Sequence, residues 1–186
     1  GVGDLEHNGG AVILNQVITK ADIDLGLLTY TPALNANGAG YDAFDFKVHD
    51  GSEYSVASYT LTVDVTAAND APTGADDSIT MGEDTTYPVV AGDFGYADVE
   101  GVPLSQVQIT ALESAGSLQL NGVDITLDQV ISKADIDAGN LTFTPAADEN
   151  GAGYDSFQFK VHDGTEYSAS AYDMTIDVTA VQDAPT

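Results

Sequence analysis

Oxygen-bearing side chains are concentrated in three short segments that lie far apart in the sequence. They are the pair Asn69-Asp70, the acids Asp98 and Glu100, and the single Asp163. Carboxylate and amide oxygens are the ligands that Ca²⁺ takes, about six to eight at a time and in loose geometry. Two carboxylates about 4 Å apart repel each other by roughly 4 kcal/mol at an effective dielectric constant of about 20. If the fold brings these segments together, we therefore expect calcium to hold them.

Simpler interpretations exist for several polar residues. Aspartate beside glycine, as at Asp50 and Asp163, is typical of turns. The segment 135–137 (Asp-Ile-Asp) resembles the start of an EF-hand loop but lacks the later acids and the closing glutamate, so we expect a helical turn there. His49 and His162 are single, outward-facing strand residues without a second histidine or a nearby nucleophile. We expect both histidines to be structural.

The motifs of common enzyme classes are missing from the sequence. Carboxylates are plentiful, but nothing marks a pair as the poised acid and base of a glycosidase. There is no glycine-rich phosphate loop, no Ser-His-Asp order and no zinc motif. We therefore predict that the chain is not an enzyme.

The net charge is strongly negative. The 186 residues include 30 acidic and 4 basic side chains, which gives a formal charge of −26. Such a charge argues against binding to nucleic acid or insertion into anionic membranes, and it leaves cation binding, a salty habitat or plain solubility as explanations. The sequence has no cysteine, so it offers neither disulfides nor thiolate metal sites. No apolar run approaches the roughly 20 residues that span a bilayer, and the first residues are not a signal peptide, so we expect any export signal to lie outside this sequence.

An ungapped internal repeat organises the chain. The segment GAGYDAFDFKVHDG at 38–51 recurs as GAGYDSFQFKVHDG at 151–164, an offset of 151 − 38 = 113 residues. Residues 3–73 align with 116–186 at this offset, with about two positions in three identical. We therefore expect two modules, 1–73 and 74–186, of which the first lacks a counterpart of 74–113. For that first module we expect either disorder or strand exchange with a second copy of the chain, because a sandwich without its first strands has open edges.

The strands needed to position the acidic loops can be located in the complete unit. Phe157, Phe159 and Val161 alternate with polar residues, which indicates a half-buried central strand. Asn121-Gly122 predicts a two-residue hairpin turn, and the segment 132–135 predicts a capped helical turn ended by a glycine. The expected strands lie within 75–81, 86–90, 106–112, 117–120, 123–127, 140–144, 151–164 and 169–179.

Many short strands with almost no helix predict an all-β fold of tandem antiparallel β-sandwich modules, of immunoglobulin type. In such a sandwich the segments of the first paragraph meet where the chain enters the second module, which we call its leading end. Tyr154 stands at the start of the central strand, where it is either a tyrosine corner or a core aromatic residue.

An ordered set of motifs resembles the cadherin-like tandem repeats of large bacterial surface proteins. The set comprises NDAPT at 69–73, Glu83-Asp84, the acidic loop 98–101, the central strand segment, and DVTAVQDAPT at 177–186. Such repeats form the extender regions of RTX-type adhesins and biofilm proteins. The resemblance implies a non-catalytic module of an extracellular or cell-surface adhesin. In it, calcium would rigidify the junctions with neighbouring repeats of the same chain.

The resemblance also implies which residues bind calcium. At the leading end the matching positions are Asn69, Asp70, Asp98, Glu100 and Asp163. The opposite, trailing end of the second module offers Glu83, Asp84, Asp148, Glu149 and Asp183. The first module departs from the pattern, because it has Asn-Ala-Asn at 35–37 where the second has Asp-Glu-Asn at 148–150. We therefore expect fewer ions, or weaker binding, at the junction present here.

Two alternative functions remain open from the sequence. The first is a carbohydrate-binding module that recognises cell-surface glycans, since related cadherin-like domains accompany polysaccharide-degrading enzymes. Sugar binding usually requires an exposed aromatic platform. The sequence has no tryptophan, and the candidate tyrosines are Tyr30, Tyr54, Tyr87, Tyr96 and Tyr167. The second alternative is a metal-free spacer whose acidity serves only solubility in salt.

Overall fold

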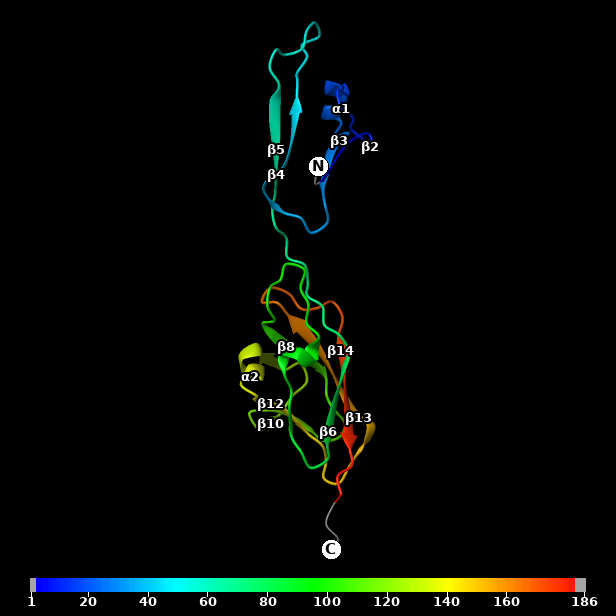
Figure 1. The fold of residues 1–186 in the computed structure, drawn as a ribbon, viewed down its shortest axis with the longest axis vertical. Helices are drawn as coiled ribbons and strands as arrows, with labels where there is room; N and C mark the ends of the chain where they lie inside the picture. The colour runs from blue at the N-terminus through cyan, green and yellow to red at the C-terminus, as the bar shows by residue number, and fades with distance from the viewer. Residues whose placement is uncertain (1–2, 183–186) are drawn as a thin grey trace. The chain divides into compact units, whose positions relative to one another are not determined.

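The chain folds into two separate units in the computed structural model, which describes residues 3–182 (Figure 1). The first unit is Gly1–Ala68 and the second is Asn69–Thr186. This division lies 73 − 68 = 5 residues before the boundary expected from the repeat. Thr73 provides the physical reason, because its backbone N–H donates to Ala97 O and its carbonyl accepts from Ala97 N, each at 2.8 Å. The segment 69–73 is thereby attached to the second unit.

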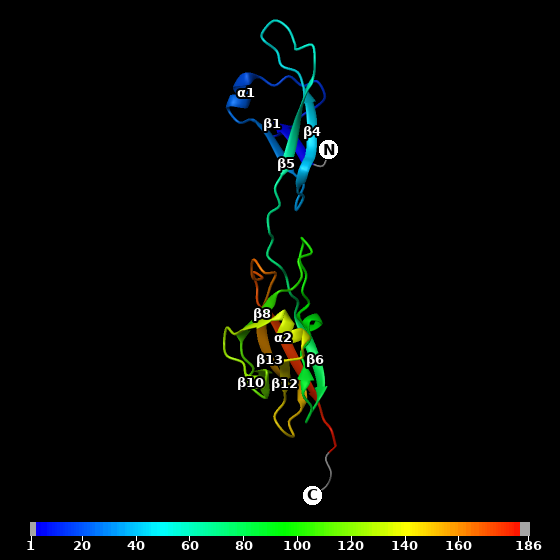
Figure 2. The same cartoon turned by 90° about the vertical axis from the view of Figure 1, so that its left-hand side faces the viewer.

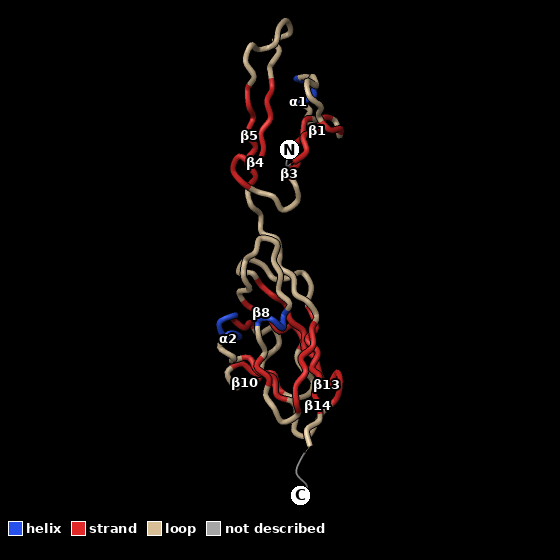
Figure 3. Tube along the Cα trace, in the orientation of Figure 1, coloured by secondary structure: helices blue, strands red, loops and turns tan. Residues whose placement is uncertain are grey.

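The second unit is a two-layered β-sandwich (Figures 2 and 3). Its strands are β6 (Asp77–Gly82), β7 (Tyr87–Pro88), β8 (Gln106–Ala111), β9 (Ser117–Leu120), β10 (Val123–Asp124), β11 (Val130–Ser132), β12 (Leu141–Thr144), β13 (Gly151–His162) and β14 (Tyr172–Thr179). One sheet has the order β11-β8-β13-β14-β6 and the other β10-β9-β12-β7. This architecture confirms the all-β, immunoglobulin-type prediction, although β6 runs parallel to β14 rather than antiparallel.

Period-2 alternation builds the core of this unit. On β13, Phe157, Phe159 and Val161 are buried while Gln158 points to solvent. On β14 the inward side chains include Met174 and Ile176. Side chains from both sheets join in one buried cluster, so burial of apolar surface holds the two layers together.

Local turn signals are also confirmed. Asn121 and Gly122 have φ of 53° and 76°, the two positive values that a type I′ turn requires between β9 and β10. The helix α2 (Lys133–Asp137) begins at Ser132, whose hydroxyl accepts from Asp135 N. Gly139, with φ of 73°, follows its C-terminus.

Four elements differ from expectation. The strand expected at 123–127 is shortened to the two residues of β10. The expected strand at 86–90 is reduced to β7, where Pro88 has no N–H for a ladder hydrogen bond. The strand β11 and the single 3₁₀ turn η1 (Ala91–Phe94) were not predicted. The turn η1 places Phe94 against Phe159, with ring centroids 4.8 Å apart in an edge-on geometry.

The first unit contains only part of this architecture. Its elements are β1 (Gly3–His7), β2 (Gly10–Ala11), α1 (Lys20–Asp24), β3 (Leu28–Pro32), β4 (Gly38–Phe46) and β5 (Tyr59–Val65). They form a sheet of order β2-β1-β3 and a two-stranded sheet of β4 and β5. No residue among 3–68 is fully buried, in contrast to the second unit. Among residues 3–182, no helix is long and apolar enough to cross a membrane.

Candidate metal centre

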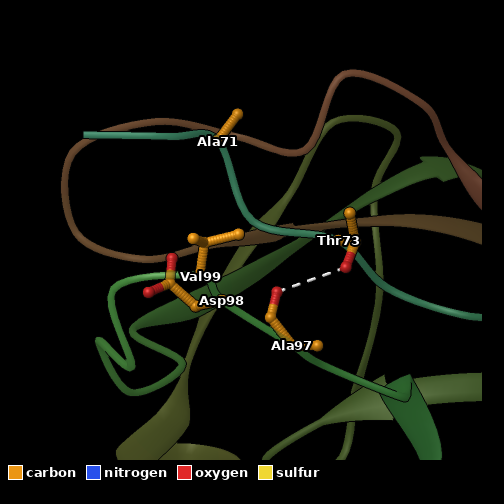
Figure 4. A pocket seen from close by; sticks show the side chains of 5 residues that line it. All are labelled: Ala71, Thr73, Ala97, Asp98 and Val99. Carbon is orange, nitrogen blue, oxygen red and sulfur yellow. Dashed lines mark hydrogen bonds between the residues drawn. The ribbon is translucent and has the colours of Figure 1, made fainter. Parts of the chain in front are cut away.

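The three segments predicted to form the leading end do meet in the second unit. Asn69 Nδ2 donates to Asp163 Oδ2 over 2.9 Å, which joins the entering chain to the loop after β13. Asp70 N donates to Glu100 Oε2 over 3.4 Å, which joins it to the loop before β8. Figure 4 shows Asp98 and Val99 on that loop beside the segment that carries Ala71 and Thr73, around a shallow hollow. The predicted convergence of the leading-end residues is therefore present.

Asp98 has one satisfied and one unsatisfied carboxylate oxygen. Its Oδ1 accepts from Val102 N over 2.8 Å, which closes the acidic loop. Its Oδ2 is buried and has no hydrogen-bond partner among the described residues. A buried charged oxygen without a partner carries a full desolvation cost. Ca²⁺ takes carboxylate oxygens as ligands. The free oxygen of Asp98 therefore fits the ion that the family resemblance implies.

Asp163 is nearly completely buried and makes the hydrogen bonds of a turn. Its Oδ1 accepts from Thr165 N over 2.5 Å and from Glu166 N over 2.8 Å. Burial raises the pKa of Asp163, but the hydrogen bonds from Glu166 N, the Asn69 amide and Thr165 N outweigh it and hold the pKa below its ordinary value. Asp163 therefore makes the hydrogen bonds expected of a turn aspartate, and its carboxylate is charged at neutral pH.

The pKa of Tyr96 responds to the negative charge at the leading end. Its hydroxyl donates to Val102 O over 2.8 Å. Burial, followed by repulsion from Asp98 and Asp163, raises the pKa of Tyr96 to about 12. Both carboxylates are thus close enough to act on one side chain. Even so, no group of three or more Asp, Glu or His side chains within residues 3–182 is already assembled as a metal site.

The trailing end is organised differently. Glu83 is buried, with Oε1 accepting from Val181 N over 2.6 Å and Oε2 accepting from Asn150 Nδ2 over 2.7 Å. Asp84 and Asp148 are exposed and have positive φ, as in tight turns. Glu149 accepts from the Tyr154 hydroxyl over 3.0 Å. Both carboxylate oxygens of Glu83 are therefore hydrogen-bonded. Asp183, which was also predicted to bind calcium, lies outside the described residues.

Other residues singled out by sequence have structural partners. Tyr154 Oη accepts from Ala146 N over 3.0 Å, which is the backbone contact of a tyrosine corner. His162 Nδ1 accepts from Gly164 N, and its ring packs edge-on against Tyr167 at 4.3 Å. His49 repeats this arrangement in the first unit. Both histidines therefore make structural contacts, but only His162 lies in a strand, because β4 ends at Phe46, before His49.

Sequence reasoning missed one important carboxylate. Asp155 is buried on β13 and accepts from Ser114 N, Ser114 Oγ, Ala115 N and Ser156 N over 2.7–3.1 Å. A signal was present, because Asp155 falls in the inward-facing register that Phe157, Phe159 and Val161 continue. Its hydrogen bonds hold the loop after β8 in place.

Comparisons with known proteins identify the fold family and little more. Residues 69–179 match the model of a family described as bacterial Ig domain. The integrin beta-like protein C of Dictyostelium discoideum is 27% identical over 197 aligned positions, which cover 96% of this chain and 10% of that protein. The chain thus spans about a tenth of the length of this curated relative. An endo-fucoidan hydrolase from glycoside hydrolase family 107 has a TM-score of 0.36 at 23% identity, covering 83% of this chain and 20% of that one.

Proposed function

The chain belongs to the bacterial Ig domain family, and we propose that it is a non-catalytic module of a large cell-surface or secreted adhesin. In this proposal calcium binds the leading end of the second unit and fixes the segment that enters it. The array of repeats then acts as an extender in adhesion, and its direct partners are neighbouring repeats. The family supports the surface role, because bacterial Ig-like domains are typically displayed outside the cell.

The observation that carries the calcium proposal is the unpartnered Asp98 Oδ2. It lies buried in the loop that also presents Glu100, and Asp163 and Asn69 meet at the same end. Asn69 and Asp70 contribute their oxygens from the entering segment itself. A cation shared by these groups would therefore bind the segment 69–73 to the body of the second unit. It would also offset the repulsion between carboxylates that lie close together at this end.

Carbohydrate binding receives less support from the tyrosines. Tyr167 and Tyr54 pack edge-on against histidines. Tyr96 is tied to the Val102 carbonyl, and Tyr87 packs against the core. Tyr30 donates its hydroxyl to Asp42 Oδ2 over 3.0 Å. Each of the five candidate tyrosines therefore has a contact within its own unit.

Thermal unfolding of the full chain with excess calcium, with EGTA and with magnesium tests the proposal. A ligand that binds only the folded state stabilises it by mass action, by about 2.7 kcal/mol at 100 times its Kd. We expect calcium alone to raise the Tm of the second unit by several degrees.

The variant Asp98→Asn keeps the shape of the side chain but removes its charge, and we expect it to lose most of the calcium response. The matched control is Asp173→Asn, on the exposed face of β14, which should respond like the original chain. An equal Tm shift in every salt, or an Asp98→Asn variant with the full calcium response, would leave the metal-free spacer as the better description.

A further inference from the structure

The first unit has a histidine at a position where the second unit has a leucine. His7 lies on β1, and its counterpart 113 residues later is Leu120 on β9, which packs against the core. The reverse exchange is found nearby, because Leu27 stands where the second unit has Asn140. Asn140 Nδ2 donates to Asp135 Oδ1, on α2, over 3.2 Å. The first unit thus lacks this amide beside its helix and has an imidazole on β1 instead.

The imidazole of His7 lies next to the acid of that helix. Asp22, on α1, is the counterpart of Asp135, and its Oδ2 lies 3.3 Å from His7 Nε2, which is a buried atom. The two side chains are 19% and 29% exposed, so the pair is largely shielded from solvent. Hydrogen bonds with Thr19 outweigh the effect of burial and, together with the attraction to His7, hold the pKa of Asp22 below its ordinary value. Asp22 therefore presents a negative charge to the imidazole at neutral pH.

The other ring nitrogen of His7 contacts the loop after β2. Gln16 Nε2 lies 3.1 Å from His7 Nδ1, and Oε1 of the same amide accepts from Ile13 N over 3.0 Å. A backbone N–H can only donate, so this second bond directs Oε1 toward Ile13 and the NH₂ group toward the ring. The Nδ1 atom must therefore accept a hydrogen bond. The proton of the neutral ring is then on Nε2, the atom next to Asp22.

The second unit contains the same loop and helix without the histidine. Thr126 N donates to Gln129 Oε1 over 2.9 Å, and these residues are the counterparts of Ile13 and Gln16. The hydroxyl caps of α1 and α2 also correspond. All these residues lie within 3–27 and within 116–140, which are equivalent parts of the two repeats. The histidine is therefore an addition to a framework that both units share.

Protonation of His7 changes which of its contacts are favourable. A protonated imidazole has a donor on each nitrogen, so its Nδ1–H would face the NH₂ group of Gln16 at 3.1 Å. Reversing the amide would turn its oxygen toward the ring, but would then direct the NH₂ group at the N–H of Ile13. One hydrogen bond of the loop is lost in either orientation. In exchange, the attraction between the ring and the carboxylate of Asp22 becomes that of two full charges.

Asp22 is the charged group that faces His7 from α1. Lys20 and Asp24, on the same helix, pair with each other. The strand β2 carries no titratable side chain. Tyr30, the titratable residue of β3, donates its hydroxyl to an aspartate of β4. The acids of β1, at positions 4 and 6, alternate with His7 and so lie on the opposite face of the strand. The local response to pH is therefore set by the ring, the loop amide and one carboxylate.

We propose that His7 makes the first unit sensitive to mildly acidic pH. When protonated, it ties β1 more strongly to α1 through Asp22 and releases the loop 13–16 from the hydrogen bond that Gln16 gives it. Histidine is the side chain whose charge ordinarily changes between about pH 5 and about pH 8. Ile13 and Leu14 are 69% and 91% exposed, so little packing holds this loop when the hydrogen bond is lost. The equivalent loop of the second unit has no histidine beside it and stays closed.

Nitrogen-15 NMR of the full chain between about pH 8 and about pH 5 tests the proposal, with Thr126 as an internal reference. At the upper pH the ring signals of His7 should show the proton on Nε2. As the pH falls, the amide of Ile13 and the NH₂ group of Gln16 should titrate together with the ring. The exchange protection of Ile13 relative to Thr126 should fall by about fivefold, the factor that one ordinary hydrogen bond is worth. A proton on Nδ1, a ring that does not titrate, or a Thr126 amide that responds as strongly as Ile13 would contradict the proposal.

Three variants separate this device from general electrostatics. His7→Leu introduces the residue of the second unit, and the Ile13 amide should then be as independent of pH as that of Thr126. Asp22→Asn removes the charge that favours the protonated ring, so the midpoint of the Ile13 response should move to lower pH. Asp24→Asn makes the same charge change on the same helix and should leave the midpoint nearly unchanged. A response that survives His7→Leu, or equal shifts from the two aspartate variants, would overturn the proposal. The titration of the original chain decides the matter if a variant fails to fold.

Discussion

At the scale of single residues, Asp155 shows how a buried charge serves the fold. Its carboxylate faces the core and takes hydrogen bonds from two backbone N–H groups of the loop 114–115. Four donors satisfy it, so the desolvation of the charge is offset. The loop in turn positions β9, which follows directly.

We expect Asp155→Ala to destabilise the second unit by about 2–4 kcal/mol, since the N–H groups of Ser114 and Ala115 lose their acceptor. Urea unfolding followed by circular dichroism measures this free energy. The exposed substitution Glu166→Ala serves as the control and should change the free energy by less than about 0.5 kcal/mol. An Asp155→Ala effect as small as that of the control would show that water replaces the carboxylate without cost.

A second residue-scale prediction concerns pH. Hydrogen bonds from the Ser132 hydroxyl and the Asn140 amide lower the pKa of Asp135 below its ordinary value of 3.8. A carboxyl whose pKa is lower in the folded state contributes stability above its unfolded pKa and loses it as the pH falls through the folded pKa. The stability advantage of the original chain over Asp135→Asn should therefore be constant above about pH 5 and shrink below pH 3.8.

Urea unfolding of both proteins between pH 7 and pH 3 measures that difference. Ser132→Ala removes the stronger donor and should reduce the pH dependence in the same direction. A difference between Asp135 and Asn that stays constant down to pH 3 would mean that Asp135 is not held as a charged group.

Residues whose partners are close in sequence were predictable, and those with distant partners were not. The cap at Ser132, the turn at Asn121-Gly122 and the corner at Tyr154 act on neighbours within eight residues. Asp155 takes three of its four donors from residues 40 and 41 positions away. The unpartnered oxygen of Asp98 likewise depends on packing that no local pattern encodes.

At the scale of elements, two glycines allow the effect of backbone conformation on a substitution to be distinguished from the effect of the surrounding space. Gly116, before β9, has φ of 72°, and a Cβ there would lie 2.7 Å from Thr144 O and 2.8 Å from the Phe143 ring. Gly122, in the β9–β10 turn, has φ of 76° but open space around it. The two positions share a positive φ and differ in their surroundings.

We therefore expect Gly122→Ala to cost about 1–2 kcal/mol, the price of a left-handed L-residue. Gly116→Ala should cost clearly more, because backbone atoms of β12 and the turn after it must also move. Gly92→Ala, at a negative φ with nothing within 4 Å, is the control and should be nearly neutral. Unfolding free energies that are equal for Gly116→Ala and Gly122→Ala would refute the steric argument.

The local sequence did not determine the secondary structure of every segment. Residues 17–19 read Val-Ile-Thr and residues 130–132 read Val-Ile-Ser, yet only the second segment is a strand. The second segment pairs with β8, and the first has no such neighbour within residues 3–68. Alternation and turn residues could therefore predict the central strands, whereas short edge strands depend on a partner elsewhere in the chain.

At the scale of the whole molecule, the repeat fixed the architecture more firmly than any motif. The offset of 113 residues predicted two modules, and the family match confirms the immunoglobulin-like fold for residues 69–179. The boundary itself was less predictable, because the pairing of Thr73 with Ala97 is a tertiary contact. The calcium site remains a proposal, because its ligands converge without forming an assembled group in residues 3–182.

The net charge of −26 allows a last prediction that separates general acidity from a specific site. Repulsion among many exposed carboxylates destabilises a compact state, and salt reduces it as the screening length falls from about 10 Å at 0.1 M to about 3 Å at 1 M. In EGTA we therefore expect KCl to raise the Tm gradually over this range, in the original chain and in Asp98→Asn alike. A calcium response should instead saturate at millimolar concentration and depend on Asp98. If molar KCl left the Tm unchanged, dispersed repulsion would not be a significant cost to this fold, and the acidic residues outside the leading end would need another explanation.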